Sequence, residues 1–346
     1  MIAPSSGRSS TLKNGRIVVS AFGGPDTLKY IEEALPEPGR REVRVKIQAA
    51  GVAYADVLMR RGLYPGTPAP PFTPGYDLVG EVDAVGEGVT DLVMGQRVGA
   101  LTVRGAYARF AVVPEELLVP VPGALDPAEA VCLILNYVTA YQMLHRVANV
   151  STGRRILIHG AAGGVGTALL QLGSLHGLTM YGTASKSKHG AIAAAGGIPI
   201  DYNAEDFSKR VRELSPNGVD AVFDAVGGTN WWRSYWLVRR GGALVCYGIS
   251  KVVTSGKPVG AGSFLLLEIL KAIPDRRRCA WYNVTNLRKK HPDWFRADLK
   301  ILLDLLAQRK IQPLVASRLP LREAAKANEQ IEHANFAGKI VLLCQE

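Results

Sequence analysis

The stretch IHGAAGGVGTALLQL, residues 158–172, decides how this chain folds. Apolar residues typical of a buried strand precede its glycines, and an apolar helical pattern follows them. Glycines at positions 160, 163, 164 and 166 permit a tight turn and a close approach of the backbone to a phosphate. The following helix would present unpaired N–H groups and the positive end of its dipole there. The pattern predicts a dinucleotide-binding turn. The alternative is a helix start that needs glycine only for tight packing.

The cofactor that this turn would hold is indicated by the end of the next strand. There the sequence reads GTASKSK (residues 182–188), where an NAD site usually carries Asp or Glu for the ribose 2′-hydroxyl. A carboxylate repels a 2′-phosphate and a lysine attracts one, so Ser185, Lys186 and Lys188 favour NADPH over NADH. The alternative is that these lysines are ordinary surface charges at a helix start. One departure from the GxGxxG pattern is Ala161 at its first glycine.

Strand and helix patterns alternate between residues 126 and 248. This alternation predicts βαβ units and a doubly wound parallel sheet. We expect strands at 154–160, 178–184, 198–202, 219–227 and 242–248, and helices at 164–176, 186–195, 204–214 and 231–239.

The residues on either side of that region have a different sequence pattern. The first 125 residues or so contain short β-branched runs separated by Gly and Pro, which predicts a compact β-rich domain with an irregular proline-rich segment at 62–75. Beyond residue 248 we expect a Gly/Ser loop at 251–262, then helices and strands that return the chain to the first domain. The expected helices are 264–273, 293–308 and 322–333, and the expected strands are 311–321 and 338–344.

Composition limits the class of protein. The 346 residues favour two domains. The net charge of +11 comes from scattered basic residues, which is typical of a solvated surface rather than of a nucleic-acid groove. No apolar run approaches the roughly 18 residues of a membrane-spanning helix. The four cysteines are far apart and form no CxxC pair, which favours reduced thiols in a cytoplasm: Cys132, Cys246, Cys279 and Cys344.

Several longer motifs resemble the medium-chain dehydrogenase/reductase superfamily. Besides the glycine turn, they are GVAYADVLMRRGLYPG (51–66), PGYDLVGEVDAVGEGV (74–89), LNYVTAY (135–141), FDAVGG (223–228) and GKIVL (338–342). The resemblance implies an α/β protein with a GroES-like β-rich catalytic domain and a Rossmann domain, and an active site between them. The implied limits are a flexible tail at 1–14, the GroES-like domain at 15–128 and 290–346, and the NADP-binding Rossmann domain at 129–289.

The zinc-dependent branch of that superfamily does not fit the sequence. Its members carry Cys where this chain has Ala53, His-Glu where it has Tyr76 and Asp77, and a further Cys near Leu135. Cys132 is offset from that last position. A catalytic zinc needs three protein ligands. The resemblance therefore points to the zinc-independent, quinone oxidoreductase-like branch, and we expect no metal site.

The resemblance also implies which residues bind the cofactor. Ala162, Gly163, Gly164, Val165 and Gly166 would bind the pyrophosphate; Ser185, Lys186 and Tyr202 would surround the 2′-phosphate; and Thr139, Cys246, Tyr247 and Gly248 would line the nicotinamide. The family commonly has Asn at the position of Ala53, so a polar contact near the nicotinamide is missing here.

The catalytic candidates follow from chemistry without a metal. Hydride addition to a conjugated carbonyl leaves negative charge on oxygen and then needs a proton. Without a metal, hydrogen-bond donors must stabilise that charge and supply the proton. We expect Tyr64 to be the donor, with Tyr137 and a ribose hydroxyl as alternatives. Tyr64 and Asp56 match family residues at the cleft. Tyr64 could instead pack on the proline-rich segment, and Asp56 could be a helix cap or an ion-pair partner.

The function we predict is NADPH-dependent reduction of a quinone or an α,β-unsaturated carbonyl, with a small hydrophobic substrate. One alternative is an enoyl-thioester reductase of a biosynthetic pathway. The other is a cofactor-bound RNA-binding protein with little turnover. We expect a homodimer that uses RRCAWYNV (277–284), no membrane partner and no nucleic-acid partner.

Overall fold

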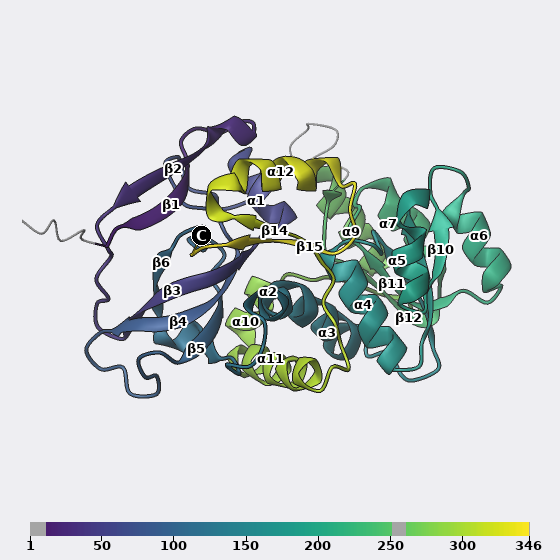
Figure 1. The fold of residues 1–346 in the computed structure, drawn as a ribbon. Coiled ribbons are helices and arrows are strands. Elements are labelled where there is room, and N and C mark those ends of the chain that lie inside the picture. The colour runs from purple at the N-terminus through teal and green to yellow at the C-terminus, as the bar shows by residue number, and fades with distance from the viewer. Residues whose placement is uncertain (1–11, 251–260, 346) are drawn as a thin grey trace, which may run out of the picture.

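The computed structural model describes residues 12–250 and 261–345, which form two large sheets with their covering helices and a small two-stranded sheet (Figure 1). One sheet has six parallel strands in the order β10-β9-β8-β11-β12-β13. Its strands are β8 (Arg155–His159), β9 (Thr179–Ala184), β10 (Ile198–Asp201), β11 (Val219–Asp224), β12 (Val238–Cys246) and β13 (Arg278–Trp281). This is the Rossmann order, with its switch point between β8 and β11. The predicted doubly wound sheet is confirmed.

Helices cover this sheet and explain why its central strands are apolar on both faces. β8 and β11 are buried along nearly their whole length, as parallel strands between two helical layers must be. The helices are α4 (Gly164–Leu175), α5 (His189–Ala194), α6 (Phe207–Leu214), α7 (Thr229–Tyr235) and α9 (Ala261–Ala272).

The second sheet has seven strands and includes the end of the chain. Its order is β14-β15-β3-β4-β5-β7, and β6 also pairs with β3. Its strands are β3 (Glu42–Gly51), β4 (Asp77–Val85), β5 (Arg97–Leu101), β6 (Phe110–Pro114), β7 (Leu118–Pro120), β14 (Val315–Pro320) and β15 (Lys339–Leu343). β15 pairs antiparallel with β3, so the chain returns to its first sheet as predicted. We keep the domain limits given above as a proposal.

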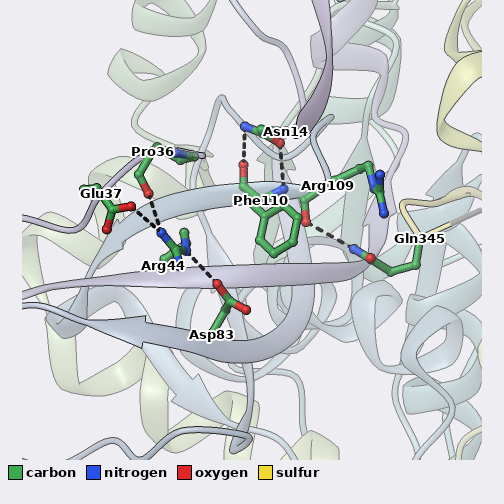
Figure 2. Close-up of polar contacts among 8 residues, drawn as sticks. All are labelled: Asn14, Pro36, Glu37, Arg44, Asp83, Arg109, Phe110 and Gln345. Atoms are coloured by element: carbon green, nitrogen blue, oxygen red, sulfur yellow. Dashed lines mark hydrogen bonds and ion pairs between the residues drawn. The ribbon is translucent and has the colours of Figure 1, made fainter. Parts of the chain in front are cut away.

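Polar side chains fasten both ends of the described chain to this sheet (Figure 2). Asn14, in β1 (Asn14–Val19), donates to the carbonyl of Phe110 and accepts from its N–H. The Gln345 amide donates to the carbonyl of Arg109 over 3.2 Å. Arg44 donates to the carbonyl of Pro36 and to the carboxylates of Glu37 and Asp83. Through Asn14, the small sheet of β1 and β2 (Leu28–Glu33) is held against β6.

A nearly continuous helical segment passes between the two sheets. It consists of α2 (Pro127–Cys132), a π-helical turn at Leu133–Tyr137, α3 (Val138–Tyr141) and a second π-helical turn at Gln142–Val147. π-Turns within helices are frequent at functional sites. The remaining helices are α1 (Tyr54–Arg60), α10 (Val284–Lys290), α11 (Pro292–Ala307) and α12 (Ala324–His333).

Several sequence-based boundaries are corrected by the structure, and the strand expected at 311–321 begins only at Val315. The helix expected at 231–239 ends at Tyr235, and β12 already begins at Val238, which pairs with Val219 before the register shifts. The helix expected from residue 204 starts at Phe207, because the Asp206 carboxylate accepts the N–H groups of the first turn. The predicted loop at 251–262 lies mainly outside the described residues, as does the tail at 1–14, of which Asn14 is already strand.

Candidate active site

The glycine turn between β8 and α4 has the geometry of an anion site. Gly160 has a φ of +66°, and the Gly163 N–H donates back to the Gly160 carbonyl over 3.0 Å. A Cβ at Gly166 would lie 2.4 Å from that same carbonyl oxygen, so position 166 must be glycine. Among the described residues no side chain caps the start of α4. Within the described chain, no side chain therefore competes with a ligand for the N–H groups of its first turn.

Two segments from outside the turn hold it in place. The Asn136 side chain packs against Gly164, where an added Cβ would lie 2.0 Å from Asn136 Nδ2. The Gly338 N–H donates to the Ala162 carbonyl over 2.9 Å. Sequence reasoning missed both contacts, although Asn136 lies within the quoted LNYVTAY motif. The predicted pyrophosphate residues, including Val165 in the first turn of α4, lie together in this one turn.

The residues expected at the 2′-phosphate are also brought together. β9 and β10 are paired neighbours with Ala184 opposite Asp201, so Ser185 and Tyr202 leave the sheet side by side. Tyr202 is 52% exposed, and Lys186 is exposed. Lys188, by contrast, donates to the Ala334 carbonyl over 2.9 Å, and burial lowers its pKa. Lys186 is thus the lysine that is open to an anion.

Three of the residues expected at the nicotinamide lie at the same edge of the sheet: Cys246, Tyr247 and Gly248. Cys246 ends β12, the Tyr247 N–H donates to the Asp224 carbonyl over 3.0 Å, and a Cβ at Gly248 would lie 2.7 Å from the carbonyl oxygen of Ala225. Thr139, in α3, is 5% exposed. Carboxyl ends of parallel strands beside a switch point are where ligands bind in such sheets.

A chain of three hydroxyl groups includes the predicted donor Tyr64. Its oxygen lies 3.0 Å from the Tyr76 oxygen, which lies 3.2 Å from Oγ1 of Thr285. The two tyrosine rings meet edge to face with centroids 6.4 Å apart. Tyr76 is 3% exposed, and burial raises its pKa, so its hydroxyl stays neutral. Tyr76 and Thr285 were not predicted as functional residues, since nothing in the sequence shows that α10 lies beside the start of β4.

Asp56 is buried, and both of its carboxylate oxygens accept hydrogen bonds. Its Oδ2 accepts the Ala53 N–H at 2.8 Å and the Tyr107 hydroxyl at 3.0 Å, and its Oδ1 accepts the Gly75 N–H at 3.1 Å. Burial raises the pKa of Asp56 to about 6 in spite of these bonds. The carboxylate joins the start of α1 to the segment that carries Tyr76. This geometry favours a positioning role over contact with a substrate.

Tyr137 lies elsewhere. It is 1% exposed, and its hydroxyl donates to Gln171 Oε1 over 2.9 Å, while the Gln171 amide donates to the Gln312 carbonyl over 2.7 Å. These contacts link the Tyr137 hydroxyl to Gln171 in α4 and, through Gln171, to the segment at Gln312. The structure does not bring it to the hydroxyl chain of Tyr64.

The residues at the zinc positions of the superfamily do not fit a zinc ion. Asp77 is buried with Lys339, whose Nζ lies 2.8 Å from its Oδ2. The Cys132 thiol donates to the Ala128 carbonyl, and burial raises its pKa to about 12. Throughout residues 12–250 and 261–345, no three His, Cys, Asp or Glu side chains are grouped as metal ligands. Ala53 and Tyr76 supply none of the usual ligands.

Comparison with known proteins decides the family. Residues 39–123 match the family model of the alcohol dehydrogenase GroES-like domain, and residues 197–342 match that of the zinc-binding dehydrogenases. A quinone oxidoreductase of Pseudomonas aeruginosa is 33% identical over 332 residues, which is 95% of this chain and 99% of that protein. The chain belongs to the medium-chain dehydrogenase/reductase superfamily, in its quinone oxidoreductase-like branch.

Three further proteins are similar to this chain. The human synaptic vesicle membrane protein VAT-1 homolog is 33% identical over 347 residues, 94% of this chain and 86% of that protein. The crystal structure of Escherichia coli quinone oxidoreductase complexed with NADPH matches with a TM-score of 0.86 at 27% identity, covering 95% of this chain and 99% of that one. The CurK enoyl reductase matches with a TM-score of 0.84 at 25% identity, covering 95% and 99%.

Two general properties complete the description. No helix within the described ranges is both long enough and apolar enough to cross a membrane. All four cysteines are free thiols, three of them buried. The expected cytoplasmic location stays a prediction.

Proposed function

We propose that this protein is a zinc-independent oxidoreductase that uses NADPH to reduce a quinone or an α,β-unsaturated carbonyl. The observation that carries the proposal is the pairing of an open glycine turn with Ser185, Lys186 and Tyr202 at the ends of β9 and β10. No carboxylate stands among these three side chains, so the site favours a 2′-phosphate. The NADPH complex of the similar Escherichia coli enzyme supports this choice.

The residues that would hold the cofactor follow from the geometry. The first N–H groups of α4, from Gly164 to Gly166, would bind the pyrophosphate. Thr139 and the turn at 246–248 would line the nicotinamide. When it is bound, NADPH supplies the hydride that reduces the substrate.

The chain's own contribution is to handle charge and protons. The Tyr64 hydroxyl is held by Tyr76 and can donate to the substrate oxygen, where negative charge develops, or deliver a proton to carbon. Asp56 accepts the N–H groups of Ala53 and Gly75, and so holds the start of α1 beside the segment that carries Tyr76. The pair formed by Tyr64 and Tyr76 presents two aromatic rings and their hydroxyl groups. It therefore fits a small, neutral, hydrophobic substrate.

An enoyl thioester is the second candidate substrate. The full-length likeness to the CurK enoyl reductase supports it, and the reaction would use the same donor. The enoyl thioester differs from a simple enone by its long acyl carrier or coenzyme arm.

Turnover of a substrate panel tests the proposal. NADPH oxidation by the purified protein is followed by absorbance with one quinone, one enone and one enoyl thioester, each also with NADH. We expect turnover of at least one of the first two, with a strong preference for NADPH. No turnover with any of the three, or equal use of NADH, would contradict the proposal. A gel-shift assay with RNA run alongside detects the low-turnover alternative.

We also propose that the protein forms a homodimer through β13. This strand lies at the end of the six-stranded sheet, and α9 beside it exposes Phe264, Leu265 and Ile269. Light scattering should give the mass of a dimer, and Ile269→Arg should shift it toward the monomer. Ile301→Arg, on the exposed face of α11, is the matched control. A monomeric mass for the unaltered protein would refute the dimer.

A further inference from the structure

The three hydroxyl groups at the site link segments that are far apart in the chain. Tyr64 follows α1, Tyr76 immediately precedes β4, and Thr285 lies in α10. The links are 3.0 Å and 3.2 Å long, and in each of them either oxygen can donate. The two tyrosines and the threonine thus form one connected path along which a proton can pass.

The burial of the three residues gives this path two accessible ends. Tyr76, in the middle, is 3% exposed. Tyr64 and Thr285 are both partly exposed. The path therefore connects the expected substrate side, at Tyr64, with a second partly exposed residue, Thr285. We expect bound substrate to cover Tyr64, so that Thr285 would be the open end.

We propose that Tyr76 and Thr285 form a proton relay that restores the proton of Tyr64 as it is given to the substrate. This inference rests on the proposed function, because it needs Tyr64 as the donor. Tyr76 and Thr285 act through Tyr64 and are positioning residues. Tyr76 stands where the zinc-dependent branch has a histidine ligand. At that position this chain carries a hydroxyl group in the relay.

The proton balance is simple. The substrate gains hydride from NADPH at the β-carbon, which leaves an enolate and NADP⁺. The Tyr64 O–H bond breaks as its proton bonds to the α-carbon. In the same step the Tyr76 proton passes to the Tyr64 oxygen, the Thr285 proton passes to the Tyr76 oxygen, and water gives a proton to Thr285 and leaves as hydroxide. One hydride and one proton are added, and each hydroxyl group ends as it began.

The test compares Thr285→Val with Thr285→Ser. Valine keeps the size and removes the hydroxyl, whereas serine keeps the hydroxyl. For reduction of an enone, we expect Thr285→Val to lower kcat roughly tenfold and Thr285→Ser to stay within about twofold of the unaltered protein, a modest part of what acid catalysis contributes. Reduction of a quinone should change little, because a quinone oxygen can take its proton directly from water. Tyr76→Phe should reproduce the effect of Thr285→Val.

Solvent deuterium provides a readout that loss of folding would not imitate. The rate of enone reduction by the unaltered protein should fall along a curve as the deuterium fraction rises, since several protons move together. In Thr285→Val the plot of rate against deuterium fraction should become linear. NADPH affinity should be the same in all variants.

The possible outcomes separate the two proposals. If the unaltered protein reduces neither enone nor quinone, the proposed function fails and the relay fails with it. If it reduces the enone and Thr285→Val matches it in both rate and isotope plot, the relay alone is overturned, and Tyr64 recovers its proton directly from water. A loss that Thr285→Ser does not rescue also overturns the relay.

Discussion

The backbone N–H of Gly338 donates to the carbonyl oxygen of Ala162, so the residue that precedes β15 is bonded directly to the glycine turn. One residue later, the Lys339 ammonium lies 2.8 Å from the buried Asp77 carboxylate, beside Tyr76. A single short segment therefore touches both the cofactor turn and the strand that follows the hydroxyl chain. The C-terminal strand fixes the distance between the two parts of the candidate site.

Gly338→Ala should weaken this connection. Gly338 has a φ of +94°, and an added Cβ would lie 2.0 Å from the Leu314 carbonyl oxygen. The left-handed backbone alone costs roughly 1–2 kcal/mol for a residue with a Cβ, and the collision adds to it. We expect a lower midpoint of thermal unfolding and weaker NADPH binding. Gly123→Ala, where an added Cβ meets nothing, is the control. Unchanged NADPH affinity in Gly338→Ala would show that the turn holds its shape without this bond.

Lys186→Glu should weaken NADPH binding and leave NADH binding almost unchanged. The substitution places a negative charge where the 2′-phosphate is expected, and NADH has no such phosphate. Fluorescence titration with both cofactors measures the effect. Lys29→Glu makes the same charge change on exposed β2, in the separate two-stranded sheet, and should affect neither titration. If the unaltered protein binds NADH as tightly as NADPH, the cofactor assignment is wrong.

The sequence predicts most of the Rossmann half because its signals are local. The glycine turn, the strand before it and the alternation that follows are each visible within a few residues. The prediction of a helix at 231–239 places it too far along the chain. The segment around Arg239 has helical spacing, but it already belongs to strand β12. There the Arg239 guanidinium donates to Asp220 on the neighbouring strand, a partner that the local pattern does not reveal.

The candidate site is less predictable because its contacts are long-range. Motifs locate Tyr64 and Asp56, but the hydroxyl chain depends on how α10 packs beside the start of β4. The same limit applies to Asn136 against Gly164 and to Lys339 with Asp77. In each case the residue types are ordinary, and only the fold brings them together.

Asp56 should make stability depend on pH. Its pKa is raised from 3.8 to about 6 by burial, so between these values the folded chain keeps a proton that the unfolded chain has lost. The free energy of unfolding should therefore fall as pH rises from about 4 to about 6 and level off above, by on the order of 2–3 kcal/mol. Urea unfolding across this range should show a shallower fall in Asp56→Asn. Parallel pH profiles for the two proteins would rule out this role of burial.

Zinc should be absent from the purified protein. Ala53 and Tyr76 replace two of the expected ligands, and Asp77 is paired with Lys339. Elemental analysis should find far less than one zinc per chain, and prolonged treatment with a chelator should leave kcat unchanged. About one zinc per chain, or activity that is lost with a chelator and regained with zinc, would contradict the zinc-independent assignment.

Tyr64→Phe should slow the reduction of an enone more than that of a quinone. The change removes one hydroxyl donor and keeps the ring that packs against Tyr76. Loss of one well-placed donor lowers kcat by on the order of 10²-fold in other enzymes. An enone must be protonated at carbon, which is slow and benefits from a positioned acid, whereas a quinone oxygen exchanges protons readily with water. NADPH affinity should barely change, because the expected phosphate contacts lie at α4 and at the end of β9. Steady-state rates for one quinone and one enone measure the effect. Equal rates for Tyr64→Phe and the unaltered protein on both substrates would return Tyr64 to a packing role and leave water as the source of the proton.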